Sequence, residues 1–173
     1  IPIDTSRTLK AKAWANPRIP SSISVQKYQL ALPIAVYGGG NHTLVLMEDG
    51  SLWGFGSNQR NAFAPGATGN RTAAVRIADS VVHASAGNGF SMWVKADGSL
   101  WGIGKNDSGA LADGTNSDHA VPIQIMRGVK RVVATLDGSS LILRTDGTLW
   151  TAGDNSCGEL GNRPRSSTNL PVK

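Results

Sequence analysis

The sequence predicts an all-β protein, a β-propeller of four-stranded blades with about three full blades and part of another. A hairpin motif, Asp-Gly-Ser/Thr-Leu-Trp, occurs three times, at residues 49–53, 97–101 and 146–150, so its copies lie 48 and 49 residues apart. A period near fifty residues built from hairpins is typical of propeller blades. Glycine is abundant, with 21 residues among 173, as many short strands joined by tight turns require. In each motif we expect a two-residue turn in which glycine supplies a positive φ.

Residues 1–33 are the least regular part of the chain, and we assign them to a partial blade or to separate N-terminal strands. Alternating apolar and polar residues predict strands at 9–14 and 24–32, with a loop rich in Pro and Ser between them. Two strands without neighbours would leave unpaired edges. We therefore favour the last two strands of a blade over a free-standing arm.

Residues 34–173 contain three repeats, at 34–79, 80–128 and 129–173. In each repeat a short apolar strand precedes a bend, two strands flank the Asp-Gly turn, and a long polar loop leads to a fourth strand. In the first repeat we expect these strands at 34–37, 42–47, 51–56 and 74–77. Pro122 and Pro171 share one place in their repeats, which predicts an outer strand where a missing N–H costs little.

Comparison of the repeats separates residues that pack from residues that could recognise a ligand. Trp53, Trp101 and Trp150 recur at one site, which predicts rings that pack between neighbouring blades. Trp93 has no aromatic counterpart, so it is a candidate for stacking on a ligand, although we favour a role in the core. A Gly-x-Asn triplet follows each hairpin, at 56–58, 104–106 and 153–155, and predicts a backbone bend capped by Asn rather than a phosphate loop.

The repeats resemble those of the regulator of chromosome condensation family. The resemblance rests on residues 39–44 and 49–58, on 101–115 and on 150–161, and it covers about residues 34–173. It implies a seven-bladed propeller, of which this chain would be about half. The chain departs from the family pattern at 61–66, where Asn-Ala-Phe-Ala-Pro-Gly replaces the usual Gly-x-Leu-Gly, and the bend histidine occurs only as His42.

An open arc of three blades would expose an apolar blade face at each end, which a monomer in water does not tolerate. We therefore expect one of two arrangements: either two chains associate as a homo-oligomer, completing a ring, or the chain is a fragment of a longer propeller. The opening at Ile1 instead of Met favours a processed or excised piece. A compact, stable monomer in a sedimentation measurement would contradict both arrangements.

The sequence contains no residues at the spacing that catalysis or metal binding requires. His42, His83 and His119 lie in different contexts without Cys or acidic partners at ligand spacing, and each hairpin turn carries a single Asp. The single cysteine, Cys157, excludes an intrachain disulfide and indicates no compartment. No apolar run is long enough to span a membrane. We expect no enzymatic activity, no cofactor and no metal.

Recognition is expected in the long loops at 57–71, 105–120 and 154–169, because these differ most between repeats and a rigid ring would present them. The candidate binding residues combine charge with aromatic character, as residues at protein interfaces do. They are Arg60, Phe63, Arg71, Trp93, Lys105, Asp107, Arg163 and Arg165.

These observations favour a non-enzymatic protein–protein interaction module, a scaffold that presents loops to a macromolecular partner. The family resemblance implies this function: its members include an exchange factor for a small GTPase that also contacts nucleosomes, and a bacterial inhibitor of β-lactamases. No binding motif of theirs matches here. Carbohydrate binding is one alternative, supported by Trp93, Tyr37 and the polar loops. Association with chromatin or nucleic acid is another, motivated by a net charge of +5, but the basic residues are scattered and argue against it.

Overall fold

The computed structural model of the chain describes residues 6–11, 14–15, 19–20, 24–29, 31–66, 68–162 and 165–173. The chain divides into two compact units, residues 1–32 and 33–173. Among the described residues every element is a β-strand, apart from the 3-10 turn η1 (Gln59–Asn61). The all-β prediction is therefore confirmed.

The first unit contains two antiparallel strand pairs. β1 (Ser6–Ala11) pairs with β4 (Ser24–Gln29), and β2 (Trp14–Ala15) pairs with β3 (Ile19–Pro20). Each pair is a two-stranded sheet. The assignment of residues 1–33 to a partial blade stays a prediction.

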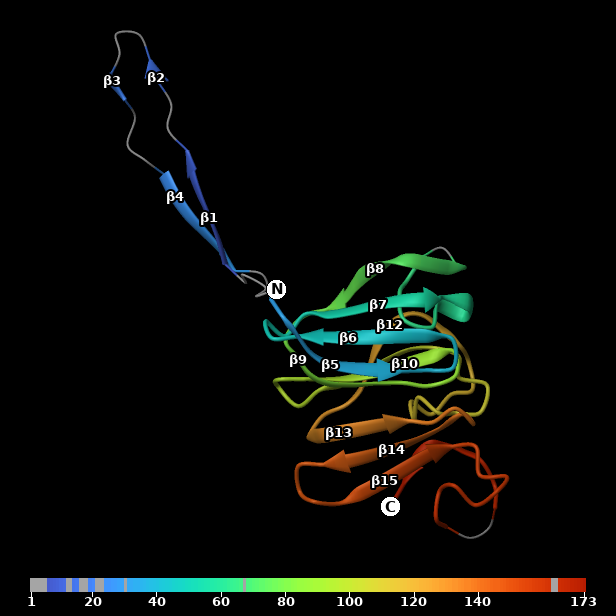
Figure 1. Cartoon of the computed structure of the whole chain (residues 1–173). Coiled ribbons are helices and arrows are strands. Elements are labelled where there is room, and N and C mark those ends of the chain that lie inside the picture. The colour runs from blue at the N-terminus through green and yellow to red at the C-terminus, as the bar shows by residue number, and fades with distance from the viewer. Residues whose placement is uncertain are drawn as a thin grey trace. The chain divides into compact units, whose positions relative to one another are not determined.

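The second unit contains three four-stranded antiparallel sheets, which we call blades 1, 2 and 3 and which lie one against the next in Figure 1. Blade 1 consists of β5 (Pro33–Gly38), β6 (His42–Met47), β7 (Leu52–Ser57) and β8 (Asn70–Ala78). Blade 2 consists of β9 (Val81–Ala86), β10 (Phe90–Lys95), β11 (Leu100–Gly104) and β12 (His119–Met126). Blade 3 consists of β13 (Val129–Ala134), β14 (Ser139–Arg144), β15 (Leu149–Gly153) and β16 (Thr168–Val172). Each strand pairs with the one that follows it in its blade, as the repeats predict.

The first and fourth strands of each blade have different surroundings. β9 contacts β5 and β6 of blade 1, and β13 contacts β9 and β10 of blade 2, so the first strands lie next to one another. The fourth strands, β8, β12 and β16, form the other edge of each sheet. Pro122 and Pro171 therefore lie on edge strands as predicted, whereas β8 begins earlier than expected and takes Arg71 out of the loop.

The hairpin turns are longer by one residue than the sequence predicts. Met47 N–H donates to Ser51 O at 2.9 Å and Gly50 N–H donates to Met47 O at 3.0 Å, so three residues form the loop. Gly50 has a φ of +77°, but Asp49 is not among the residues with positive φ, as a primed two-residue turn would require. The turns after Lys95 and Arg144 have the same hydrogen bonds. The turn is thus a tight turn followed by a glycine in the left-handed region.

Each turn links its aspartate to the repeated tryptophan through one hydroxyl group. Ser51 N–H and Oγ–H donate to Asp49 Oδ1 at 2.9 and 2.6 Å, and Trp53 Nε1–H donates to Ser51 Oγ at 2.9 Å. The hydrogen bond from the Ser51 hydroxyl, with that from its N–H, lowers the pKa of Asp49 below its ordinary value. The same chain of bonds joins 97, 99 and 101 in blade 2, and 146, 148 and 150 in blade 3.

A buried asparagine holds each long loop, as the Gly-x-Asn triplet predicts. In blade 2, Asn106 Oδ1 accepts the N–H of Leu111 at 2.9 Å, and Asn106 Nδ2–H donates to Thr115 O at 3.0 Å. Asn58 and Asn155 occupy the same place in blades 1 and 3 and accept backbone N–H groups five residues further along. All three side chains are fully enclosed, so each replaces water as the partner of buried loop backbone.

The hydrophobic core lies in two clusters, one at each junction between blades. The first cluster includes Leu44, Leu46, Leu52 and Phe63 from blade 1, and Val81, Ala84, Ala86, Trp93 and Ile103 from blade 2. The second includes Phe90, Met92, Val94 and Leu100 from blade 2, and Val129, Val132, Ala134, Ile142 and Ala152 from blade 3. Trp101 packs at the border of the first cluster and Trp150 at the border of the second, so these two rings do pack between blades. Val81 N–H and Val129 N–H add hydrogen bonds across the junctions, to Gly50 O and Gly98 O at 2.9 and 3.0 Å.

Candidate functional site

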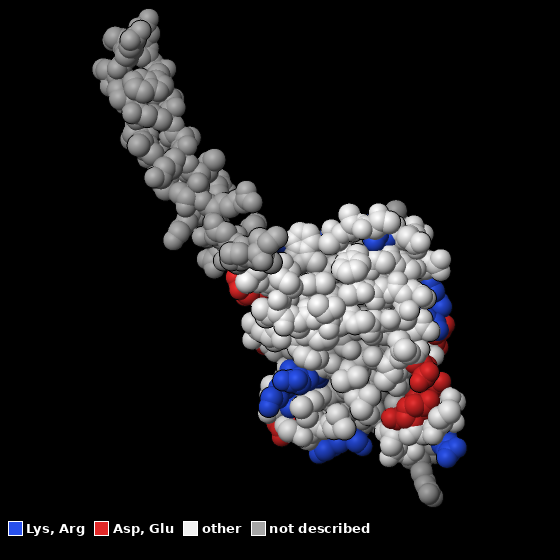
Figure 2. All heavy atoms as spheres, viewed as in Figure 1, with Lys and Arg blue, Asp and Glu red and all other residues white. Residues whose placement is uncertain are grey.

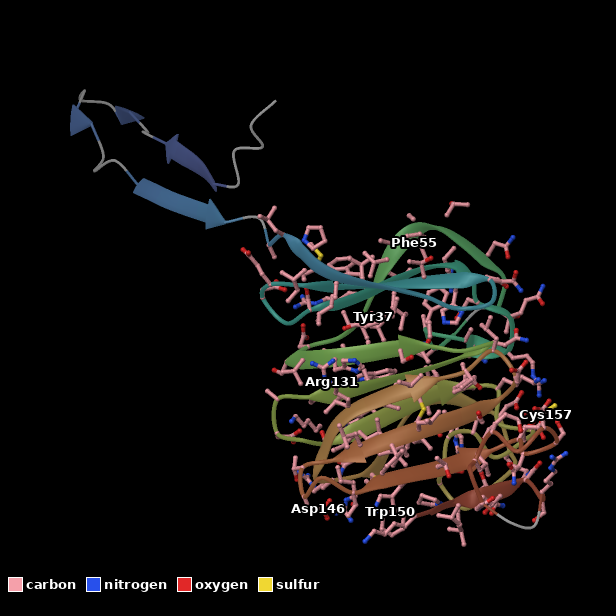
Figure 3. The ribbon with its side chains drawn as sticks, turned by 60° about the horizontal axis from the view of Figure 1, so that its bottom comes forward. Tyr37, Phe55, Arg131, Asp146, Trp150 and Cys157 are labelled. Carbon is pink, nitrogen blue, oxygen red and sulfur yellow. The ribbon has the colours of Figure 1, made fainter. Side chains whose placement is uncertain are left out.

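The turns and the long loops lie at opposite ends of the blades. In Figure 3, Asp146 marks a turn of blade 3 and Cys157 marks the long loop of the same blade, on opposite sides of the view. Strand direction explains this separation, since each turn follows the second strand and each loop follows the third. We call the side with the long loops the loop end.

At the loop end, a network of charges joins blade 1 to blade 2. Arg60 Nη1 lies 3.0 Å from Asp107 Oδ2, and Arg60 Nε lies 2.5 Å from Asp118 Oδ2. Lys105 Nζ approaches Asp107 Oδ1 at 3.3 Å. Burial acts to raise the pKa of Asp107, but hydrogen bonds from Arg60 and Lys105 outweigh it and hold that pKa below its ordinary value. The two cationic side chains thus face two carboxylates across the junction.

The backbone that carries Arg60 is strained. Arg60 has φ 56° and ψ 24°, and Asn61 has φ 57°, so two consecutive residues with side chains adopt the left-handed region. Such residues cost about 1–3 kcal/mol each and cluster at ligand-binding and switch regions. Here the strained turn aims the guanidinium at blade 2.

Two neighbouring hollows open beside this network. A hollow of about 190 Å³ lies between blades 1 and 2 and is lined by Asn41, His42, Ser57, Gln59, Arg60, Ala62, Asn88, Gly89 and Lys105. A more open cleft of about 650 Å³ is lined by Asn41, Phe55, Gly56, Ser57, Gln59, Asn70, Arg71 and Thr72. Asn41, Ser57 and Gln59 line both, so the two hollows form one polar surface with amide groups, hydroxyls and three cationic side chains.

The inner wall of the smaller hollow is a buried histidine. His42 Nε2 lies 2.9 Å from Ser91 Oγ, and Ser91 Oγ–H donates to Ala62 O at 2.7 Å. Because the serine proton is used in that bond, His42 Nε2 must donate to the hydroxyl. The imidazole stacks on Phe63 with ring centres 5.6 Å apart. Burial lowers the pKa of His42 to about 4, so the ring is neutral at neutral pH and links the blades rather than offering a charge.

Three of the eight predicted binding residues line this surface, and a fourth, Asp107, pairs with two of them. Arg60, Lys105 and Asp107 form the charge network, and Arg71 lines the larger cleft from β8. Arg165 lies exposed in the long loop of blade 3. Arg163 lies outside the described residues.

Two of the predicted binding residues are placed where no partner can touch them. Phe63 and Trp93 are both fully buried in the cluster between blades 1 and 2. Phe63 occupies the position that Leu111 and Leu160 hold in the other blades, and all three are buried. The departure from the repeat pattern at residues 61–66 therefore changes a core side chain and not a binding surface. Trp93 fills the same junction from β10, which confirms the core role that the sequence favoured and shows that its inclusion among the candidate binding residues was wrong.

Three residues at the site are not among the candidates from the sequence: Asn41 and Gln59 line both hollows, and Asp118 pairs with Arg60. Asp118 had a detectable signal: the loop at 57–71 has two arginines and no acidic residue, whereas the loop at 105–120 has three aspartates. Neighbouring blades bring these loops together, so their opposite charges predict ion pairs across the junction. Gln59 and Asn41 gave no such signal, because polar amides are ordinary loop residues.

One face of the blades is poor in charge at its middle. Figure 2 shows that on the visible face of the blades charged side chains gather towards the margins and leave the middle uncharged. Within the described ranges, no group of three or more His, Cys, Asp or Glu side chains is placed to hold a metal ion. None of the helical segments in the described part of the chain has the length and apolar character to span a membrane.

Comparisons with known proteins agree with this architecture. The regulator of chromosome condensation (RCC1) repeat matches residues 34–62 and 129–159. Yeast RCC1 (Prp20) bound to Kap60 superimposes with a TM-score of 0.72 at 20% identity, over 87% of this chain and 38% of the relative. Human WBSCR16 superimposes with a TM-score of 0.68 at 20% identity, over 86% of this chain and 40% of the relative. A comparison with curated protein sequences finds no match.

A second structure of Prp20p, from Saccharomyces cerevisiae, superimposes with a TM-score of 0.72 at 19% identity over 87% of this chain. The chain spans about two fifths of the length of each of these relatives. At sequence identities this low, the structural likeness establishes the fold alone. Two stretches of the chain, one in blade 1 and one in blade 3, thus match the repeat of the regulator of chromosome condensation type, and the likeness to the solved structures shows that the blades have a β-propeller fold.

Proposed function

We propose that the chain is a non-enzymatic interaction module, and that the loop end of blades 1 and 2 binds a protein partner. The observation that carries this proposal is the strained turn at Arg60 and Asn61 beside two connected polar hollows. A strained backbone conformation persists only where the surrounding structure holds it in place. Such residues cluster at binding and catalytic sites.

The composition of the hollows supports a protein partner. Amide and hydroxyl groups such as Asn41, Gln59 and Ser57 can both donate and accept, so they suit a peptide backbone. Arg60 is a residue type enriched where proteins bind tightly. The relatives agree with this class: yeast Prp20 is seen bound to Kap60, and Prp20p has been studied for its binding to Gsp1p and histones.

The arrangement of the candidate residues favours neither alternative. Carbohydrate binding rested on Trp93, which is buried, and on Tyr37, which packs edge-on against His83 with ring centres 5.5 Å apart. Nucleic-acid binding needs unpaired cations in a cluster. At the loop end Arg60 and Lys105 face Asp107 and Asp118 instead.

The proposal is tested by quantitative affinity purification from the source cells with three forms of the chain. Lys105→Glu reverses a charge beside the smaller hollow. Lys130→Glu makes the same change at an exposed site on β13, outside the loop end, and serves as the matched control. We expect the control to retain the wild-type partner and Lys105→Glu to bind it about tenfold more weakly, the effect of about 1.4 kcal/mol at a contact residue.

Equal retention by all three forms would contradict the proposal. A glycan array and a DNA column test the alternatives with the same proteins. Glycan binding, or DNA retention that falls steeply as salt rises, would replace the protein-binding proposal.

A further inference from the structure

The turn end, opposite the loop end, is positively charged in blades 2 and 3. Its hairpin turns and adjoining strand ends, residues 95–99, 127–131 and 144–148, contain five cationic side chains and two aspartates, a net charge of +3. Figure 2 shows Lys and Arg atoms grouped at this end of the two blades, and Figure 3 labels Arg131 there, on the side away from Cys157. We call the five cationic residues the basic turn surface: Lys95, Arg127, Lys130, Arg131 and Arg144.

The fold gathers these residues from three separate segments. Val129 N–H donates to Gly98 O at 3.0 Å, which joins the start of β13 to the turn of blade 2. Val129 also pairs with Arg144 of β14, and Thr145 N–H donates to Gly128 O at 2.9 Å. All three segments are therefore in direct contact. Both blades that form the surface are present in the structure, and the contacts between them fix its shape.

The charges of this surface are largely available to an outside partner. Arg127 Nη1 lies 3.4 Å from Asp97 Oδ2, but both side chains are more than half exposed, so water screens this pair. Lys130 and Arg131 are exposed and form no ion pair with another described residue. Cations without partners in the protein can donate charge-assisted hydrogen bonds to carboxylates of another molecule.

Two further cations of the surface are held in place by the repeated tryptophans. Lys95 Nζ lies 4.8 Å from the ring centre of Trp101, and the guanidinium carbon of Arg144 lies 5.9 Å from that of Trp150. The ring faces attract these cations without cancelling their charge. Met47 has the same position in blade 1, so folding of a blade does not require a cation there. Side chains that are already ordered lose less entropy when a ligand binds, which favours recognition.

The loop end of the same two blades has the opposite charge. Its described residues include six acidic side chains and two cationic ones: Asp107, Asp113, Asp118, Asp137, Asp154 and Glu159, with Lys105 and Arg165. This separation of charge attracts an acidic molecule to the turn end of blades 2 and 3 and repels it from their loop end. The surface therefore suits an acidic partner.

The details of the surface favour a protein segment over a nucleic acid. Asp97 and Asp146 lie among the cations, and each accepts hydrogen bonds from the hydroxyl and N–H of the residue two positions further along. These bonds hold the pKa of both carboxyls below the ordinary value, so both are negative at neutral pH. A nucleic-acid backbone, with a charge at every phosphate, meets repulsion there. A peptide can place neutral residues opposite the aspartates, and Val82, 55% exposed on the contacting strand β9, offers it an apolar contact.

We propose that the basic turn surface binds an acidic segment of a protein partner. Carboxylates of the segment pair with Lys130, Arg131 and Arg144, and an apolar side chain of the segment packs on Val82. This site lies at the opposite end of the blades from the hollows beside Arg60, so the chain can hold two partners at once. The attraction between exposed charges is screened by salt, so the affinity depends on ionic strength.

Fluorescence anisotropy with the full chain and three labelled probes tests the proposal. The first probe is a short peptide in which glutamates alternate with Gly and Leu, and the second has Gln in place of each Glu. The third is a single-stranded DNA of the same net charge as the first. We expect the Glu peptide to bind at least about tenfold more tightly than either other probe, and its affinity to fall as salt rises.

Charge-reversal variants locate the binding. Arg131→Glu is expected to weaken binding of the Glu peptide about tenfold. Arg165→Glu makes the same change at an exposed loop-end residue and serves as the matched control, which should bind the peptide like wild type. Arg131→Gln, with an expected loss of about threefold, replaces Arg131→Glu if circular dichroism shows that the reversal impairs folding.

Three results would overturn the proposal. They are absence of Glu-peptide binding at low salt, equal losses in the Arg131 and Arg165 variants, and tighter binding of the DNA, which would make the partner a nucleic acid. Lys105→Glu alters only the loop end and should bind the Glu peptide like wild type. Loss of a loop-end partner in that variant therefore leaves this test unaffected, and the two sites succeed or fail separately.

Discussion

At the scale of the residue, buried polar side chains decide how the loops and junctions are held. The repeated Asn side chain could be read from the sequence, because a Gly-x-Asn triplet follows each hairpin and its role is local. For Trp93 the sequence favoured a core role but left ligand stacking open, because a residue that differs between repeats can fill an irregular gap in the core or form a binding site. Which of the two holds depends on what lies opposite, and that residue is distant in sequence.

His42 leads to a prediction about pH. Its pKa falls from 6.5 to about 4 on folding because burial penalises the charged ring. Between these values the unfolded chain binds a proton that the folded chain does not, so folding stability is fully present above pH 6.5 and decreases as pH falls towards 4. The loss from His42 amounts to about 3 kcal/mol, and urea unfolding at several pH values measures it.

The matched variant for this prediction is His42→Phe, the residue that blade 2 has at the same place. This variant should remove most of the decrease in folding stability between pH 6.5 and 4. The remaining decrease is due to His83, whose pKa is lowered by burial and by the nearby Arg131. NMR titration of His42 gives its pKa directly. A pKa near 6.5 would contradict the burial argument.

At the scale of the element, the strand pattern was predictable and the turn geometry was not. Alternation and the Asp-Gly motif located every strand of the three blades to within a few residues. The turn has three residues because the Asp49 side chain binds the Ser51 N–H and hydroxyl, which stabilises a tight turn before the glycine. The Asp-Gly motif is compatible with both a two-residue and a three-residue turn. The register in which the two flanking strands pair decides between them.

A glycine at the end of the third strand of each blade leads to a second prediction. Gly104 has a φ of +105°, and a methyl group on its Cα would lie 2.5 Å from the carbonyl oxygen of Gly89. Gly66 has a similar φ of +96° with nothing nearby. Gly66→Ala is expected to cost about 1 kcal/mol from backbone strain alone, and Gly104→Ala about 2–4 kcal/mol because the clash adds to it. Denaturant unfolding distinguishes them, and equal losses would show that the close contact relaxes freely.

At the scale of the whole molecule, stability comes from junctions between blades. Both core clusters lie at these junctions. The candidate site follows from the same stacking, because Arg60 of one blade meets Asp107 and Asp118 of the next. The sequence pointed to Arg60, Lys105 and Asp107 as loop residues of the right type, but their grouping required the order and spacing of blades.

A third prediction compares one residue type inside and outside a junction. Leu100→Ala removes a fully buried side chain between blades 2 and 3 and is expected to cost about 2–5 kcal/mol. Leu149→Ala makes the same change where the side chain is half exposed, so its cost should be below about 1.5 kcal/mol in dilute protein. Thermal unfolding at low concentration measures both. A cost for Leu149→Ala equal to that for Leu100→Ala would mean that its face is covered under those conditions.

The sequence by itself determined the fold class, the number of complete blades, the strand order and the Asn residues that cap the loops. Each of these depends on interactions within about fifty residues, and the repetition of the motif made the pattern recognisable. Only the tertiary structure decided that Trp93 and Phe63 are core residues, that Arg60 spans two blades, and that Leu149 and Val36 are exposed where their equivalents are buried. The physical reason is that a side chain on a blade face is buried by the neighbouring blade, so its burial cannot be read from the sequence of a single repeat.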